Sequence, residues 1–396
     1  MRILHTSDWH LGRSFHREDL LEAQASFVDH LLATVASERV DLVVVSGDVY
    51  DRALPPVDAV ELADETFARL AASRASVVVT SGNHDSQIRL GFGARLADAA
   101  GIHLRTRWQD VGTPVLLEDA HGPVAVHGLP YLEPDAVRGP WGLPARTHEA
   151  ALTEAMARVH ADLEGRPGVR SVVMAHAFVA GNPDAAAAMA SASERDISVG
   201  GVQIAPTSLF KDVDYAALGH LHGRQTLADH IRYSGSPLAY SFSEAGHTKG
   251  SWLVELGAGG VERCDVVPAP VPRRLATIRG RIEDLLAAPE HAAVEGSWLQ
   301  VTLTDPARPP HAMDRLRARF PHVLVIAFEP EGAARPRGPV MPRVDGRSDL
   351  DVALGFVAEV RSLEATTEEA LLLQLACDSC RVNEDADRPV RVAEAG

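Results

Sequence analysis

The fold is most constrained by an alternation of short apolar runs with amphipathic stretches through the first half of the chain. The apolar runs have the length and valine content of buried strands, and they lie at residues 2–6, 41–46, 76–81, 124–129, 171–175 and 215–218. The stretches with helical spacing of apolar residues lie at 19–37, 56–72, 86–100 and 147–163. Such alternation predicts an α/β layered domain, in which ligand sites gather beyond the carboxyl ends of strands.

Proline-rich segments divide the rest of the chain. The segment PAPVPRR, at 268–274, follows a region of shorter strands and indicates a domain boundary. We therefore expect a first domain over 1–267, a compact α/β unit over 274–330, a linker over 331–347 and a helical tail over 348–396. The tail should contain two helices, near 349–363 and 368–381, and Thr366 with Glu369 fits a capping box for the second.

Composition excludes several classes of protein. Hydrophobic residues make up 46% of the 396 residues, yet no apolar run is long enough to cross a membrane, and Asp8 and His10 interrupt any signal peptide. Three cysteines do not make a disulfide framework. Cys377 and Cys380 lack a second pair nearby, so zinc or redox chemistry is disfavoured and their role stays open. We expect a globular cytoplasmic protein with no membrane partner.

The charge of the chain is uneven. A net charge of −16 argues against a nucleic-acid binder that relies on a basic surface alone. Residues 271–347 are the exception, because they carry 12 basic against 9 acidic side chains. The balance of charge thus differs between segments of the chain.

Side chains able to bind a metal come directly after the predicted strands. In an extended chain alternate side chains share a face, so Asp8 and His10 should point the same way, and His220 and His222 repeat that spacing. The other polar residues at strand ends are Asp48, Asp51, Asn83, His84, Asp85 and His176. Any one of the 18 histidines is more often structural than a ligand. Carboxylates and imidazoles gathered at one sheet edge nevertheless indicate a metal site.

The motifs at these positions form an ordered series: Asp-x-His, Gly-Asp-x-x-Asp, Gly-Asn-His-Asp, a separate histidine and Gly-His-x-His. This series resembles the signature of the calcineurin-like metallophosphoesterases. Within that superfamily, the SbcD family of bacterial nuclease subunits is closely similar at ILHTSDWHLGR, GDVYDRALPP, SGNHDS, SERDISVGG and RYSGSPLAYSFSEAG. The resemblance is dense over 1–256 and unspecific over 270–396. It implies a β-sandwich flanked by helices (αββα), a small α/β capping domain and a helical C-terminal tail. The capping domain would contact DNA, and the local basic excess fits a role over the DNA backbone.

The resemblance also implies how the donors divide between two metal ions. One ion would be bound by Asp8, His10 and His222, the other by Asn83, His176 and His220, with Asp48 bridging both. Members of the family use manganese, so we expect two Mn²⁺ per chain, although the mixed donors also suit Fe²⁺, Mg²⁺ or Zn²⁺. Two divalent ions carry more charge than Asp8 and Asp48 return, so the site would attract phosphate within an acidic protein.

The resemblance gives catalytic roles to two residues that are not ligands. His84 would stabilise or protonate the oxygen that leaves the phosphorus, and Asp85 would orient its ring. Asp51 is either a hydrogen-bond partner of a ligand or a turn residue. Three arginines flank the motifs and could contact DNA phosphates, although exposed arginines are common: Arg13, Arg17 and Arg52.

The implied function is that of a nuclease subunit in DNA repair, recombination and replication. With an SbcC-type coiled-coil ATPase as partner, it would degrade double-stranded DNA as an ATP-dependent exonuclease and cut hairpins and single strands as an endonuclease. Members of the family form homodimers through the phosphoesterase domain. The apolar stripes of the tail helices would bind the ATPase or pack on this chain's own core. The sequence does not indicate the cleavage polarity, the preferred DNA end, the metal used in the cell or the activity without the ATPase.

Two other functions stay open at the level of sequence. The same scaffold serves phosphoesterases of small molecules and phosphoproteins, but the protein phosphatases carry Gly-Asn-His-Glu where this chain has Asp85. A catalytically silent scaffold subunit would have lost metal ligands, and here every ligand position is filled.

Overall fold

The computed structural model describes residues 1–181, 204–331, 348–361 and 364–386. The segment SERDISVGG, at 193–201, and the expected linker beyond residue 331 lie outside these residues. The chain divides into two compact units. The first comprises Met1–Arg279, Glu283–Thr302 and His311–Ala327, and the second comprises Gly280–Ile282, Leu303–Pro310 and Phe328–Gly396. The boundaries expected at residues 267, 274, 330 and 347 stay a prediction.

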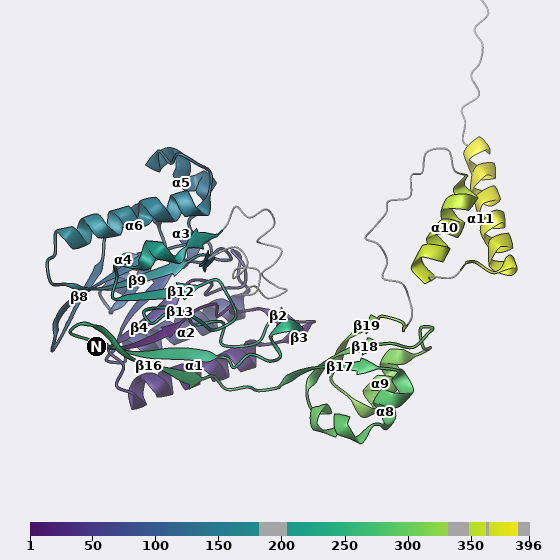
Figure 1. Cartoon of the computed structure of the whole chain (residues 1–396), viewed down its shortest axis with the longest axis horizontal. Coiled ribbons are helices and arrows are strands. Elements are labelled where there is room, and N and C mark those ends of the chain that lie inside the picture. The colour runs from purple at the N-terminus through teal and green to yellow at the C-terminus, as the bar shows by residue number, and fades with distance from the viewer. Residues whose placement is uncertain (182–203, 332–347, 362–363, 387–396) are drawn as a thin grey trace, which may run out of the picture. The chain divides into compact units, whose positions relative to one another are not determined.

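Two six-stranded sheets form the body of the first unit (Figure 1). One sheet has the order β16 (Gly260–Pro268), β15 (Gly250–Gly257), β1 (Arg2–Thr6), β4 (Leu42–Ser46), β5 (Ser76–Thr80) and β6 (Ile102–Arg105). The other has the order β13 (Gln225–Ala228), β14 (Ile231–Tyr233), β12 (Tyr215–Gly219), β9 (Arg170–His176), β8 (Gly122–Leu129) and β7 (Val115–Asp119). Four neighbouring strands are parallel in each sheet, so their carboxyl ends share an edge.

Alternate residues of each strand separate the apolar layers. Leu42 and Val44 of β4 lie in a cluster shared with Met174 of β9, between the two sheets. Val43 and Val45 pack instead in a second cluster with helix α1 (Leu21–Ser37) and helix α2 (Val57–Ala71). The outer face of the other sheet is covered by α5 (Pro134–Trp141) and α6 (His148–Glu164). The expected αββα sandwich is therefore confirmed.

The helix expected over 86–100 is wrong. Residues there form two short helices, α3 (Gln87–Leu90) and α4 (Ala94–Asp98). Gly93 separates them with a φ of 76°, a left-handed conformation that glycine adopts without strain and that a continuous helix cannot contain. The structure also contains two short strand pairs, β2 (Ser14–Phe15) with β3 (Glu18–Asp19), and β10 (Val179–Ala180) with β11 (Ala205–Pro206).

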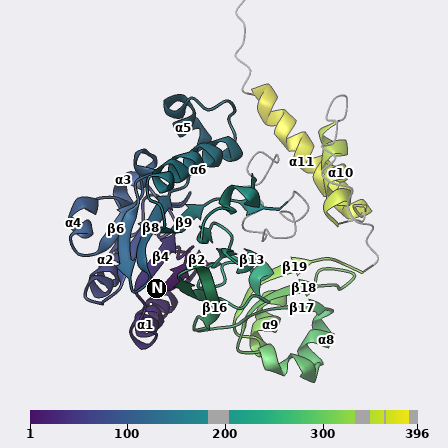
Figure 2. The same cartoon turned by 60° about the vertical axis from the view of Figure 1, so that its left-hand side comes forward.

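Strands and helices both occur after residue 274, as expected of an α/β unit. Strands β17 (Leu275–Gly280), β18 (Trp298–Leu303) and β19 (Val323–Phe328) form a small sheet, and helices α8 (Ile282–Ala287) and α9 (Ala312–Arg319) connect them (Figure 2). Two tail helices follow, α10 (Asp349–Arg361) and α11 (Thr367–Ala386).

The capping box of the second tail helix is also confirmed. The Thr366 N–H donates to Oε2 of Glu369 at 2.9 Å, and the Glu369 N–H donates to Oγ1 of Thr366 at 3.3 Å. Cys377 lies in α11, whereas the side chain of Cys380 lies outside the described residues. Throughout the described parts of the chain, each helix is too short or too polar to cross a bilayer.

Candidate metal centre

The candidate ligands lie where strands of both sheets end. In the first sheet, the loops after β1, β4 and β5 carry Asp8, His10, Asp48 and Asn83. In the second sheet, β9 and the loop after β12 carry His176, His220 and His222. The structure brings all seven residues together, and all except Asn83 are buried.

Sharp backbone turns, rather than strand alternation, aim these side chains inward. Asp8, His10 and Asp48 have φ values of 53°, 47° and 51°, and His220 has a φ of 101°. The left-handed region is uncommon outside glycine, although aspartate and histidine enter it more often than most residues. Asp8 and His10 also lie beyond the end of β1, so the extended-chain reason given for their shared direction is wrong. Such backbone conformations persist only where the surroundings enforce them, and they cluster at functional sites.

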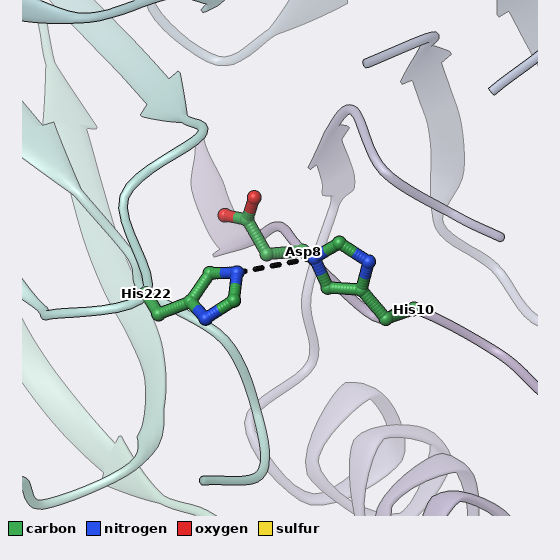
Figure 3. A group of neighbouring side chains, drawn as sticks. All are labelled: Asp8, His10 and His222. Carbon is green, nitrogen blue, oxygen red and sulfur yellow. Dashed lines mark hydrogen bonds between the residues drawn. The ribbon is translucent and has the colours of Figure 1, made fainter. Parts of the chain in front are cut away.

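Asp8, His10 and His222 form the first donor group (Figure 3). One ligand atom from each of the three lies within 4.8 Å of the others. The Nε2 atoms of His10 and His222 face each other at 3.1 Å. Two ring nitrogens and a carboxylate that converge in a buried space are a donor set that a divalent cation fits.

Asn83, His176 and His220 form the second donor group. Oδ1 of Asn83 lies 3.0 Å from Nε2 of His176 and 3.0 Å from Nδ1 of His220. The other ring nitrogen of His176, Nδ1, donates to the backbone oxygen of Ser46 at 2.9 Å. In the neutral ring that hydrogen bond leaves the lone pair on Nε2, so the nitrogen that faces the site is the one able to bind a cation.

Asp48 lies between the two groups. Its Oδ2 is 3.7 Å from Nε2 of His10 and 3.3 Å from Nε2 of His176. Its Oδ1 accepts a hydrogen bond from the backbone N–H of His84 at 2.9 Å. One carboxylate is thus within reach of donors from both groups, and the bridging role that the resemblance implies for it stays a prediction.

Two glycines make room for Asp48 and His176. Gly47 has a φ of 83°, and a Cβ there would lie 2.3 Å from Nδ1 of His176. A Cβ on Gly82 would lie 2.1 Å from Oδ1 of Asp48. Any larger residue at either position would push a candidate ligand out of place, so the glycines in these motifs permit close approach of the loops.

Burial shapes the charge of the cluster. It raises the pKa of Asp8 to about 6, lowers the pKa of His220 to about 3 and lowers that of His10 well below its ordinary value. Burial would also raise the pKa of Asp48, but the charge of His176 outweighs it and holds that pKa well below its usual range. In turn Asp48 overcomes burial and raises the pKa of His176 to about 9. The proton on His176 therefore occupies a place that a metal cation would take on binding.

The expected contact between Asp85 and the His84 ring is wrong. Nδ1 of His84 lies 2.8 Å from the backbone oxygen of Asp51, which holds the ring instead. The Asp85 carboxylate accepts three backbone N–H groups, those of Val49 at 3.1 Å, Tyr50 at 2.9 Å and Gly82 at 2.9 Å. Asp85 thus ties together the two loops that carry Asp48 and Asn83.

Asp51 lies beside a candidate ligand without a hydrogen bond to it, so the choice between its two expected roles stays open. Its Oδ1 is 3.6 Å from Nδ1 of His10, too long for a hydrogen bond, and 3.1 Å from Nη1 of Arg13. The Arg13 guanidinium also lies 5.0 Å from the ring centroid of Tyr240. Arg17 is exposed at the turn between β2 and β3, and Arg52 is exposed after β4. Contact of these three arginines with DNA stays a prediction.

Three residues near the site were not anticipated. Glu244 is buried behind His222, and Lys249 pairs with Glu244. Tyr131 places its ring centroid 6.3 Å from that of His176 and 6.4 Å from that of His220. Lys249 carried a weak signal, because it is one of only two lysines in the chain. Nothing in the sequence distinguished Tyr131.

Comparison with known proteins agrees with this geometry. The calcineurin-like phosphoesterase family matches residues 1–224, and the type 5 capsule protein repressor C-terminal domain matches residues 271–361. The chain is 30% identical over 329 residues to the SbcD subunit of the nuclease SbcCD from Staphylococcus saprophyticus, covering 82% of this chain and 84% of that protein.

Two solved structures are similar at low scores. The protein TT1561 of Thermus thermophilus shares 12% identity and covers 67% of this chain and 98% of its own, with a TM-score of 0.40. A dimetal phosphatase from Danio rerio shares 14% identity and covers 68% and 99%, with a TM-score of 0.38. These two likenesses are too low to add to the family assignment.

The family match spans more than half of the chain, and the identity to the relative extends across four-fifths of it. Both agree with the motif order in the sequence and with the seven side chains that meet at the strand ends. This chain therefore belongs to the calcineurin-like phosphoesterase family and, within it, to the SbcD nuclease subunits.

Proposed function

We propose that this chain is the nuclease subunit of a DNA-processing complex and that it hydrolyses phosphodiester bonds with two divalent ions. As a member of its family the chain is a metal-dependent phosphoesterase. The observation that carries the two-ion proposal is the position of Asp48, 3.7 Å from His10 and 3.3 Å from His176. A carboxylate between two donor groups can be shared by two ions, and ion pairs of this kind serve in-line displacement at phosphorus.

The donor set also bears on the identity of the ions. Bound there, divalent ions would activate a water and neutralise the charge that grows on the phosphate. One ion would be held by Asp8, His10 and His222, the other by Asn83, His176 and His220, with Asp48 shared. Ring nitrogens mixed with carboxylate and amide oxygens suit a metal of intermediate softness, and we propose Mn²⁺.

We assign His84 to the leaving group, in a position where one ligand atom each of His10, Asp48 and His84 lie within 4.8 Å of one another. Its Nδ1–H donates to the Asp51 backbone oxygen at 2.8 Å, which fixes the ring. Its ring centroid lies 4.8 Å from that of His10, so the imidazole borders the first donor group. With Nδ1 satisfied, Nε2 can carry a proton to the departing sugar oxygen.

A metal-dependent cleavage assay tests the proposed function. The protein, stripped of metal, is offered Mn²⁺, Mg²⁺ or Zn²⁺ with blunt duplex, hairpin or single-stranded DNA, and a generic phosphomonoester runs in parallel. We expect DNA cleavage that depends on Mn²⁺ and little hydrolysis of the monoester. Fast monoester hydrolysis without DNA cleavage would support a small-molecule phosphoesterase. A silent scaffold would cleave neither substrate with any ion.

The tail supports a second part of the proposal, a coiled-coil ATPase as partner. Exposed apolar side chains line both tail helices: Phe356 is 65% exposed, Leu371 62%, Leu372 66% and Leu375 58%. Exposed apolar residues in such a row mark an interaction surface. The name of the similar protein places it in an SbcCD assembly, and an SbcC-type ATPase is the partner we propose for this face.

Removal of the tail should separate partner binding from catalysis. Truncation after Arg343 should abolish co-purification with the ATPase and ATP-stimulated duplex cleavage, while metal content and Mn²⁺-dependent single-strand cleavage persist. In the full chain, Leu371→Ser with Leu375→Ser should weaken ATPase binding at least about tenfold, and the matched exposed change Glu368→Ser should not. A large fall in melting temperature on truncation would show instead that the tail belongs to the chain's own core.

A second exposed apolar surface supports the homodimer that we propose. It consists of Leu54, Val57, Val60, Ile88, Phe92 and Leu96, which are 42% to 88% exposed. The Arg89 guanidinium donates to the Ala53 backbone oxygen at 3.2 Å, so the loop before α2 and helix α3 are joined. In a two-fold dimer this surface of each chain would pack against the same surface of the other, so both copies would be buried.

Charges placed on this surface should split the dimer. We expect Ile88→Asp with Phe92→Asp to convert a dimer into a monomer in sedimentation equilibrium at micromolar concentration, because each interface would then bury four unpaired carboxylates. Leu116→Asp is a matched control, since Leu116 is 52% exposed but lies on β7 of the other sheet. A monomeric wild-type protein, or equal dissociation by the control, would contradict this interface.

A further inference from the structure

The His222 ring is held at both of its nitrogens. Nε2 faces Nε2 of His10 at 3.1 Å, inside the first donor group. Nδ1 lies 3.1 Å from Oε1 of Glu244, a residue that ends a short 3₁₀ turn (Phe242–Glu244). Because the carboxylate accepts the Nδ1 proton, the lone pair of the ring is left on Nε2, the nitrogen that faces the site.

Lys249 holds the carboxylate and the ligand's backbone at the same time. Its Nζ lies 2.5 Å from Oε2 of Glu244 and donates to the backbone oxygen of His222 at 2.8 Å. It also contacts Oγ of Ser236 at 2.9 Å, while the Tyr240 N–H donates to Oε2 of Glu244 at 3.2 Å. The Lys249 ammonium group thus holds both the carboxylate of Glu244 and the backbone of His222.

Core stability alone does not account for such a pair. Glu244 is 1% exposed and Lys249 is 6% exposed, and the desolvation of two buried charges offsets most of their attraction. The other candidate ligands are backed differently. His176 uses the neutral backbone oxygen of Ser46, and Nδ1 of His10 has no hydrogen-bond partner among the described residues. A full carboxylate behind His222 makes this imidazole a more basic and better oriented donor.

We propose that Glu244 and Lys249 are positioning residues that tune one ion of the pair. Glu244 sets the tautomer and orientation of the His222 ring. Lys249 fixes the position of the Glu244 carboxylate relative to the His222 backbone. This inference rests on the proposed two-ion function and deepens it. The inference predicts that loss of the pair weakens metal binding at one site only. The ion held by Asp8, His10 and His222 should bind less tightly, while the ion held by the group around Asn83 should bind as before.

Metal titration of two variants tests the inference without relying on activity. Glu244→Gln changes the charge with little change in shape. Glu244→Gln with Lys249→Met removes both charges, so no unpaired charge stays buried. We expect calorimetric Mn²⁺ titration of either folded variant to show one ion bound as in the wild type and the other weakened about 10- to 100-fold. A purely structural role would instead lower the melting temperature and leave both affinities unchanged.

A matched pair elsewhere in the chain supplies the control. Asp162 contacts Nε2 of the buried His127 at 3.1 Å, and neither residue belongs to a donor group, so Asp162→Asn should leave both Mn²⁺ affinities unchanged. Wild-type affinity for two ions in the Glu244 variants would overturn the positioning role. A wild-type protein that binds fewer than two ions would overturn the two-ion function itself, so the two failures are distinguishable.

Discussion

Asp48→Ala should release both bound ions and abolish DNA cleavage together. The Asp48 carboxylate is the contact that both donor groups share, through His10 at 3.7 Å and His176 at 3.3 Å. Its loss also leaves the buried His176 without the charge that raises its pKa to about 9. Removal of the ions should raise the activation free energy of hydrolysis by several kcal/mol, which slows cleavage on the order of 10³-fold or more. Metal content per chain and the cleavage rate are the measurements.

A surface carboxylate provides the comparison for this variant. Asp98 pairs with His103 and Arg105 at a partly exposed position, so Asp98→Ala should keep two ions and the wild-type rate. If Asp48→Ala still binds two Mn²⁺ per chain, Asp48 does not bridge them.

His84→Ala should separate chemistry from binding. The ring is fixed by the Asp51 backbone oxygen, and His84 belongs to neither of the two proposed ligand sets, so both ions should stay bound. The turnover number should fall about 10²- to 10⁴-fold, which is the usual contribution of a positioned general acid. The dissociation constant for DNA should change little. Single-turnover cleavage and metal analysis of the same preparation make both measurements.

The leaving group offers a second readout for His84. A DNA analogue with a leaving oxygen that needs no proton should restore much of the lost rate in His84→Ala, because the missing acid is then unnecessary. Loss of metal comparable to that of Asp48→Ala would make His84 a ligand and contradict the role proposed for it.

The sequence predicted the layered sandwich because strands that are buried on both faces consist almost entirely of apolar residues. Strand β4 is buried along its whole length, and the unbroken valine-rich apolar run at 42–45 is typical of a strand covered on both faces. The break between α3 and α4 was missed because Gly93 acts through its φ of 76°, and apolar periodicity carries no information on backbone dihedral angles.

The sequence identified which side chains the fold brings together, but not the backbone geometry that brings them there. Asp8 and His10 do meet, yet left-handed turns bring them together rather than the alternation of a strand. The role of Asp85 could not be foreseen, because its partners are backbone N–H groups, which every sequence supplies. Glu244 lies 22 residues from His222 in the chain, and only the folded arrangement places its carboxylate against the ring.

The central claim is that two ions act together on a DNA phosphodiester, and a titration of cleavage against bound metal tests it most directly. Metal-free protein receives Mn²⁺ in steps while bound metal and the cleavage of a labelled hairpin DNA are followed in the same samples. We predict almost no cleavage with one equivalent of Mn²⁺ bound and a steep rise as the second equivalent binds. Full cleavage with one equivalent, or cleavage that persists without metal, would contradict the account.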